Sequence, residues 1–300
     1  MAENKRFATW NSIGTEVSKC NNNLAEILKS AGLDYTVESR PVTVSGIDGN
    51  NDRFHAIVRS NDNHVYNIAK KSYTICQNED AFSLIDQLDN SVHIVRAGET
   101  GSGMIYLIGE LPEVNVLGDA YKPHLIFQNS HTADFALKSA VVPLRIVCQN
   151  QFNVAFKEAR NQHTIRHTSS INSQISAAND VMADTIKYME VFGNRAEELA
   201  TEKVSVNKIA EQLFPMPATA AEKVGERIEQ KRETFLSIYN NDDNQNFKGT
   251  AWGVLNAATD YATHNVGEKS NADNRFISSV IYPEFTKLAL NALRMQGVSI

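Results

Sequence analysis

The chemistry that stands out first in this sequence lies between Lys138 and His167, where the charge is opposite to that of the whole chain. Five basic residues face a single acidic one, Glu158, which gives a local charge of +4 in a chain of net charge −6. Lys and Arg side chains neutralise phosphates and release their counterions. This segment is therefore the first candidate for binding a polyanion.

The roles within this segment depend on a helix that we expect after Asn150, where basic and polar side chains would gather on neighbouring turns. We assign phosphate contacts to four basic residues, and orientation of the ligand backbone to one amide and one histidine. The phosphate contacts are Arg145, Lys157, Arg160 and Arg166. The amide that orients the ligand backbone is Asn150, and the histidine is His167.

A second interpretation of the basic segment needs no ligand. Residues 179–243 carry thirteen acidic and eight basic side chains, a net charge of −5. A solvated basic helix packed against these acidic helices would be neutralised within the chain itself, as surface ion pairs commonly are. The sequence leaves both interpretations open.

A smaller basic site is Lys70-Lys71, followed closely by Tyr73. Adjacent lysines at the end of a strand and beside an aromatic ring are able to contact phosphate and stack a base. If the polyanion is a nucleic acid, we assign these three residues as contacts to its second strand. The alternative is an ordinary solvated turn.

A polar stripe follows Gly249. Thr250 is expected to cap a helix, on which Trp252, Asn256, Asp260 and His264 recur every four residues and share one face. Asp260 and His264 are two potential metal ligands, but a site needs a third or a fourth. We therefore expect a structural network, in which Asp260 accepts a hydrogen bond from His264 or from a nearby arginine.

Catalytic motifs are absent from the sequence. It contains no GxSxG, no HExxH and no Walker A pattern, and the Gly-rich stretch Gly98–Gly103 has no Lys-Ser/Thr pair after it. We expect a non-enzymatic protein with no cofactor and no metal. The three cysteines, Cys20, Cys76 and Cys148, are far apart, which favours reduced thiols. With no signal peptide and no apolar run long enough to span a membrane, we expect a cytoplasmic protein without a membrane partner.

The elements that must position these residues change character near residue 152. Before it, short runs rich in Val, Ile, Tyr and Thr alternate with Gly, Asn and Asp, which predicts strands. The links between them leave no room for helical crossovers, so the sheet should be antiparallel, with Gly98–Gly103 as a hairpin loop. Helices are expected from Leu24, capped by Asn23 and ended by Gly32, and from Asn78.

After residue 152, apolar residues recur at helical spacing. One long helix should bury a stripe from Ile171 to Met189, and another a stripe from Val224 to Ile238. The prolines of 214–220 should separate two helices. A last helix should begin at Pro283, and its apolar face is expected to be Phe285, Leu288, Ala292 and Met295.

Together these patterns predict an α+β fold: a mostly antiparallel, curved sheet with packed helices, followed by a helical C-terminal half. We divide the chain into an N-terminal helical arm (1–34), an antiparallel α+β core (35–168) and a helical region that packs on the core (169–300).

Six landmarks, in order, support a resemblance to a known group. They are Tyr73-Thr74-Ile75-Cys76-Gln77-Asn78, Gly118-Asp119, "FQNSHTADFA" from Phe127, "VPLRIVCQNQF" from Val142, "IRHT" from Ile165 and "GTAWGVLNAATDYATH" from Gly249. With them the chain resembles the phage/plasmid-like proteins of unknown function found in phages, prophages and conjugative plasmids. At the level of the fold, it is also similar to single-strand annealing proteins of the Redβ, RecT and Erf type.

These resemblances imply a single-stranded DNA-binding and annealing protein of a mobile element, ATP-independent, acting in recombination or replication in the bacterial host cytoplasm. Its partners would be single-stranded DNA, further copies of itself in a ring or filament, and a phage exonuclease or host single-strand-binding protein. The alternative is a phage protein-interaction or anti-defence factor that binds a host protein through its acidic helical half.

Overall fold

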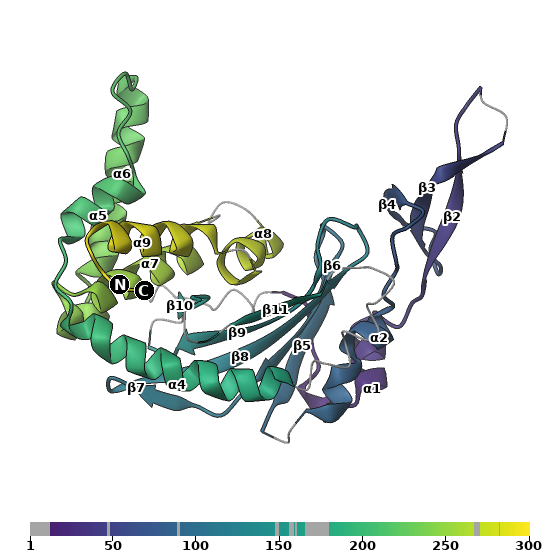
Figure 1. The fold of residues 1–300 in the computed structure, drawn as a ribbon, viewed down its shortest axis with the longest axis horizontal. Coiled ribbons are helices and arrows are strands. Elements are labelled where there is room, and N and C mark those ends of the chain that lie inside the picture. The colour runs from purple at the N-terminus through teal and green to yellow at the C-terminus, as the bar shows by residue number, and fades with distance from the viewer. Residues whose placement is uncertain are drawn as a thin grey trace, which may run out of the picture.

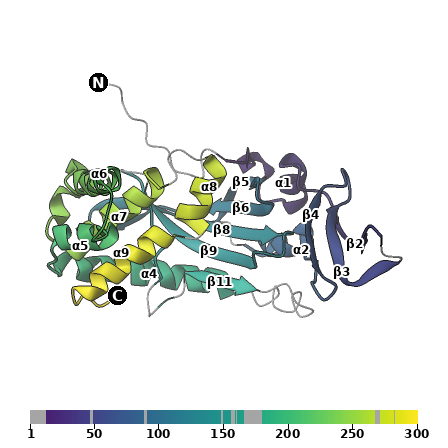
Figure 2. The ribbon, with the colours of Figure 1, turned by 90° about the horizontal axis from the view of Figure 1, so that it is seen from above.

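Two antiparallel sheets and a set of helices make up the structure, a computed structural model (Figure 1). It describes residues 13–46, 49–88, 91–147, 150–155, 159, 161–165, 180–266, 271–281 and 283–300. Figures 1 and 2 agree that a small sheet lies at one end, the helical half at the other and a large sheet between them. The expected α+β class, with the sheets before the helices, is confirmed.

The large sheet is built by antiparallel pairing between strands that follow one another closely in the chain. Its order is β1 (Thr15–Glu16), β5 (His93–Glu99), β6 (Met104–Glu110), β8 (Asp119–Ser130), β9 (Leu137–Arg145) and β10 (Asn150–Gln151). In addition, β7 (Val114–Val116) pairs with β8, and β11 (Gln162–Ile165) pairs with β9. All of these pairings are antiparallel, as the short links predict.

The small sheet consists of β2 (Val37–Thr43), β3 (Asn50–Arg59) and β4 (Val65–Lys70), paired in that order. Irregularities in register occur between Pro41 and Thr43 and between Ile57 and Val58. Such bulges bend and twist a strand. Ile57 and Val58 are buried at the base of this sheet, whereas Val65 and Ile68 on β4 are exposed.

Apolar side chains of the large sheet pack on both of its faces. One face, with Tyr106, Ile126 and Val142, is covered by α8 (Ala272–Phe276) and the π-helix η6 (Ile277–Ile281). The other, with Leu107 and Phe127, belongs to the main core. The further elements that contribute to this core include η2 (Ser18–Cys20), α1 (Leu24–Ser30), α2 (Asn78–Phe82), η3 (Ser83–Gln87) and α4 (Asp180–Thr201).

The helical half continues from α4 and surrounds one buried helix. Its elements are α5 (Val206–Leu213), α6 (Glu222–Tyr239), η5 (Asp242–Phe247), α7 (Ala251–His264) and α9 (Glu284–Met295). Every residue of α7 from Ala251 to Thr263 is buried. The expected break at the prolines of 214–220 and the helix around Val224–Ile238 are both confirmed. Among the helices that the structure describes, none is both long and apolar enough to cross a membrane.

Local signals in the sequence explain several boundaries. The Asn23 side chain accepts a hydrogen bond from the Glu26 amide, and Gly32 has φ of +68° just beyond α1, as expected. In the β5–β6 hairpin Gly103 has φ of +75°. A Cβ at this position would lie 2.8 Å from a Thr132 methyl group and 3.2 Å from the Tyr66 ring. Only glycine allows both the turn and this close approach.

The prediction of a helix directly after Asn150 is wrong for the residues that the structure describes there. Asn150–Gln151 form β10, and Gln162–Ile165 form β11, both antiparallel to β9. Pairing with β9 overrides the local helical pattern, because it satisfies backbone groups that would otherwise be buried without partners. Thr164 and Ile165 are β-branched, which suits a strand.

Three expected apolar stripes are partly wrong. In α6, Phe235 and Ile238 are buried as expected, but Val224 is exposed. In α4, Ile186 is 67% exposed and Tyr188 and Phe192 are buried, while Ile171, Ile175 and Ala178 lie outside the described residues. In α9, Leu288 and Met295 are exposed, and the buried face instead includes Ala289, Leu290 and Leu293. A period of 3.6 residues fits two neighbouring stripes on α9, and packing against α7 selects the one with the small Ala289.

The described part of the N-terminal segment, residues 13–34, contains β1, η2 and α1. Its strand β1 pairs with β5, so this segment lies along the edge of the large sheet. The first proposed boundary, after residue 34, falls between α1 and β2. The second, after residue 168, lies outside the described residues.

Candidate functional site

The end of the small sheet nearest Lys70 brings three basic side chains and one aromatic ring together. Lys70 pairs with Phe54 across β3 and β4, and the Lys71 amide donates a hydrogen bond to the Arg53 carbonyl, at 3.0 Å. The Arg53 guanidinium lies 5.4 Å from the centre of the Phe54 ring. Because side chains alternate along a strand, Lys70 and Phe54 share one face, and Arg53 and Lys71 the other. We call these four residues the basic end.

The three cations of the basic end are more exposed to solvent than the neighbouring Tyr73. Arg53, Lys70 and Lys71 are exposed, and Phe54 is half-buried. Tyr73 is half-buried, and its hydroxyl donates to the Ser130 carbonyl at 3.2 Å. Burial raises the pKa of Tyr73, so the hydroxyl stays protonated at neutral pH. Tyr73 therefore ties the segment after β4 to the large sheet, and its stacking on a base stays a prediction.

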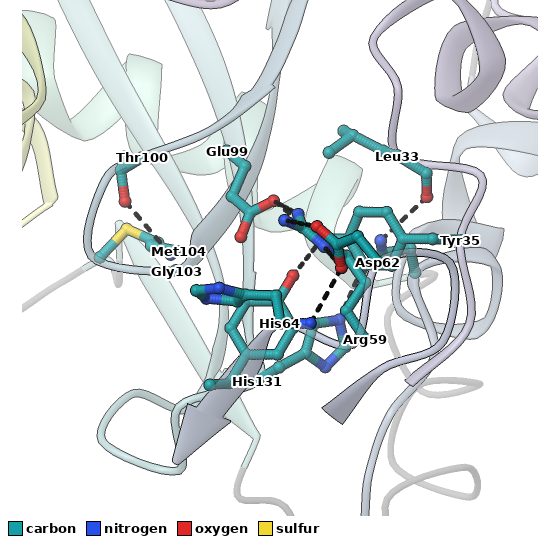
Figure 3. Close-up of polar contacts among 12 residues, drawn as sticks. Leu33, Tyr35, Arg59, Asp62, His64, Glu99, Thr100, Gly103, Met104 and His131 are labelled. Carbon is teal, nitrogen blue, oxygen red and sulfur yellow. Dashed lines mark hydrogen bonds and ion pairs between the residues drawn. The ribbon is translucent and has the colours of Figure 1, made fainter. Parts of the chain in front are cut away.

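A joint between the two sheets forms around Arg59, the last residue of β3 (Figure 3). Its guanidinium donates to Glu99 at 2.9 Å and to both Asp62 oxygens at 3.0 and 2.8 Å. It also lies 5.1 Å from the centre of the Tyr35 ring and 5.7 Å from that of Tyr66. Arg59 thus combines ion pairs with cation–π contacts.

Hydrogen bonds extend the joint into the large sheet. The Tyr66 hydroxyl donates to the Tyr35 hydroxyl at 2.8 Å, which in turn donates to Glu99 at 3.1 Å. Asn67 donates to the Thr132 carbonyl. We call the five residues that join the sheets in this way the joint: Tyr35, Arg59, Tyr66, Asn67 and Glu99.

His131 lies beneath the joint and is fully buried. Its ring centre is 5.4 Å from that of Tyr66, and its Nε2 is 3.0 Å from Asn78 Oδ1. The Asn78 amide nitrogen donates to the Leu33 carbonyl at 3.0 Å, so Oδ1 must accept. His131 therefore carries its proton on Nε2 and donates to Asn78.

Ionisation at the joint is fixed near neutral pH. Burial raises the pKa of Tyr35 to about 12 and also raises that of Tyr66. The hydrogen bond from Arg59 lowers the pKa of Asp62 to about 2, and the same bond raises that of Arg59. None of these four groups titrates near pH 7, so they suit a structural connection better than acid–base catalysis.

Arg145, the first expected phosphate contact, lies in the interior. Its Nε and Nη2 atoms donate to Asp119 at 2.9 and 2.6 Å, and Nη2 also donates to the Asp243 carbonyl at 2.6 Å. Its side chain is 3% exposed. A phosphate contact would require this ion pair to break.

Other members of the basic segment are also directed inward. Asn150 is buried and donates to Thr259 Oγ1 at 2.6 Å and to the Asn256 carbonyl at 3.2 Å. Lys138 is buried, and its ammonium donates to the Ile281 carbonyl at 3.4 Å. His163 lies 3.0 Å from Asp184 on α4, the kind of contact that neutralisation within the chain predicts. Lys157, Arg160, Arg166 and His167 lie outside the described residues.

The polar stripe lies on α7, and the Thr250 side chain caps this helix as expected. Trp252 is fully buried and stacks on Phe152 with a distance of 5.5 Å between ring centres. Asn256 donates to the Trp252 carbonyl of its own helix at 3.0 Å. Asp260 is buried, and His264 is half-buried. Within the described ranges, no group of three or more His, Cys, Asp and Glu side chains is placed to bind a metal.

Sequence patterns did not reveal the joint. Arg59 and Glu99 are 40 residues apart, and only the register of the two sheets brings them together. One local signal was present: Arg59 and Asp62 flank the β3–β4 turn with the spacing of an ion pair.

Comparison with known proteins gives one match. A family model described as "Domain of unknown function (DUF932)" matches residues 65–279. These residues include β4, Arg145 and α7, and exclude β2 and β3. No curated protein and no solved structure matches the chain.

Proposed function

The chain belongs to the DUF932 family of domains of unknown function, and from that premise we propose that it binds and anneals single-stranded DNA for a phage or other mobile element. The observation that carries the proposal is the basic end. Three exposed cations and an aromatic ring meet on a sheet that projects from the body (Figures 1 and 2).

The chemistry of the basic end suits a single strand. Proteins that bind single strands without sequence preference combine cations that follow the backbone with aromatic rings on which bases stack. Phe54 offers a ring beside Lys70, and Arg53 and Lys71 lie on the opposite face of the same strands. A strand that passes over the edge of β4 would meet cations on both faces.

The proposed biological setting follows from the resemblance of the sequence landmarks to phage/plasmid-like proteins. Annealing would need no ATP and would serve recombination or replication in the cytoplasm of the bacterial host. Copies of the chain would assemble along the DNA as a ring or filament, together with a phage exonuclease or a host single-strand-binding protein. Lys157, Arg160, Arg166 and His167 remain proposed contacts, while the ion pair of Arg145 argues for a structural role of that residue.

The proposal is tested by fluorescence anisotropy with a labelled oligonucleotide over a range of salt concentrations. Affinity should fall as salt rises, and Lys70→Glu/Lys71→Glu should weaken binding at least about tenfold and lower the salt slope by about 1.4, since each phosphate contact on a single strand contributes about 0.7. Lys223→Glu/Lys231→Glu on α6 makes the same change in net charge and is the matched control. No binding at low salt would refute the proposal.

A second candidate function is binding of a host protein through the acidic helical half. The net charge of −5 over residues 179–243 and two exposed apolar side chains near the start of α6, Met216 and Val224, favour it. On this alternative, Glu226→Lys/Glu233→Lys would abolish co-purification of one host protein, and Lys70→Glu/Lys71→Glu would have no effect on it. If DNA binding were lost only in Lys70→Glu/Lys71→Glu, that result would refute this alternative.

A further inference from the structure

A small polar pocket lies where α7 and η5 meet the end of β9, far from the basic end. Two apolar side chains and six polar ones line it. The polar ones are Arg145, Asn241, Asp243, Asn244, Asn256 and Asp260. Five of these six residues carry side-chain oxygens, the ligand type that hard cations prefer.

Two amide oxygens of this lining are buried and have no hydrogen-bond partner: Asn244 Oδ1 and Asn256 Oδ1. Their orientations are fixed by the other end of each amide. The Asn244 nitrogen donates to the carbonyls of Tyr239 and Gly253, at 3.1 and 2.9 Å, and the Asn256 nitrogen donates to that of Trp252 at 3.0 Å. Turning either amide over would lose these bonds, so both oxygens must serve as acceptors.

The charged side chains that line this pocket give it a negative net charge. Two aspartates, Asp243 and Asp260, line the pocket together with a single guanidinium, that of Arg145. Arg145 is already bound to Asp119 and to the Asp243 carbonyl. Asp260 is buried and lines the same pocket, where a cation or several hydrogen bonds stabilise a carboxylate. A carboxylate has about four acceptor positions, so Asp260 can serve more than one partner.

We propose that this pocket binds one divalent cation, Mg²⁺ or Ca²⁺, through Asn244 Oδ1, Asn256 Oδ1 and the carboxylate of Asp260. Amide and carboxylate oxygens, with water in the remaining positions, are the usual ligands of both ions. An anion is disfavoured, since the amide groups present acceptors and not donors. The softer transition metals prefer imidazole or thiolate ligands.

The ion would connect two elements that are separate in the chain. Asn244 belongs to η5, and Asn256 and Asp260 belong to α7. A cation shared by them would lock η5 against α7 beside the Arg145–Asp119 pair. This site lies at the opposite end of the large sheet from the basic end, so ion binding and the DNA contact of the basic end can be tested separately.

Calorimetry and thermal melting of the full chain test the site, after treatment with EDTA and then with Mg²⁺ or Ca²⁺ alone. One ion should bind per chain, and at a hundredfold excess over Kd the melting temperature should rise by about 5 °C. Asp260→Asn and Asn256→Leu should lose this rise. Asp242→Asn, an exposed carboxylate in the same η5 that does not line the pocket, should keep it.

A wild-type measurement keeps the test independent of variants that unfold. Mn²⁺ replaces Mg²⁺ in oxygen sites and is paramagnetic, so it should broaden the indole N–H signal of Trp252, which lies one turn from Asn256, at a stoichiometric dose. No binding at millimolar Mg²⁺ and Ca²⁺ would overturn the proposal. Equal binding by wild type and all three variants would overturn it as well, because the ion would then lie elsewhere.

Discussion

Arg59 and Arg145 each connect the large sheet to another part of the molecule, but their surroundings differ. Arg59 reaches the large sheet through the Glu99 carboxylate, whereas Arg145 pairs with Asp119 inside that sheet and reaches η5 through the Asp243 carbonyl. Arg145 is 3% exposed, and its contacts include the Asp119 carboxylate and the Asp243 backbone carbonyl. Arg59 is 21% exposed and has two carboxylates and two aromatic rings around it. Water can replace a lost partner at Arg59 and has little access to Arg145. Arg59 thus lies in a partly exposed joint, and Arg145 in a buried ion pair.

This difference suggests what each region does. A buried ion pair is weak evidence for stability in itself, but removing one partner leaves an uncompensated charge. Arg145 therefore holds the end of β9 and η5 together. Arg59 orients the small sheet, whose exposed basic end is the proposed DNA contact.

The largest effect should follow Arg145→Met. Loss of the guanidinium leaves Asp119 and the Asp243 carbonyl without their donor, and we expect the free energy of unfolding to fall by roughly 3 kcal/mol, the lower end for buried pairs because Asp119 is a quarter exposed. Urea denaturation measures it. A decrease in the free energy of unfolding of less than about 1 kcal/mol would contradict this expectation, because exposed ion pairs contribute that little.

Arg59→Met should cost less, about 1 kcal/mol, because the side chain is partly exposed and Tyr35 can still donate to Glu99. Its effect should be local. Hydrogen exchange should accelerate at the backbone amides of β2, β3 and β4 and stay unchanged in α7. Uniform acceleration along the chain would show that the joint supports the whole fold and does not merely orient the small sheet.

The smallest effect concerns pH. The hydrogen bond from Arg59 lowers the pKa of Asp62 from 3.8 to about 2. A lowered folded-state pKa means that this contribution is present above pH 4 and disappears as the pH falls towards 2. Acid titration of the Asp62→Asn variant should therefore show a shallower loss of stability between pH 4 and 2 than wild type. Parallel curves would contradict the Arg59–Asp62 pair.

Local signals in the sequence predicted those parts of the fold that depend on a few neighbouring residues. The Asn23 and Thr250 caps and the turn at Gly32 follow from side-chain chemistry that acts over three or four positions. The antiparallel order followed from links too short for crossovers.

Long-range pairing explains what the sequence could not show. β11 contains His163 and follows a basic stretch, so only its ladder with β9 identifies it as a strand. Glu99 gives no local sign that it will meet Arg59 and Tyr35 from another sheet. The orphaned amide oxygens of Asn244 and Asn256 depend on the packing of η5 on α7.

We propose that the basic end, and not the helical half, contacts DNA. Hydrogen exchange of the wild-type chain with and without a saturating single-stranded oligonucleotide tests it most directly. We expect slower exchange in peptides that cover residues 50–73 and no change in those that cover α6. Protection confined to α6, or no protection anywhere under conditions of measured binding, would contradict it.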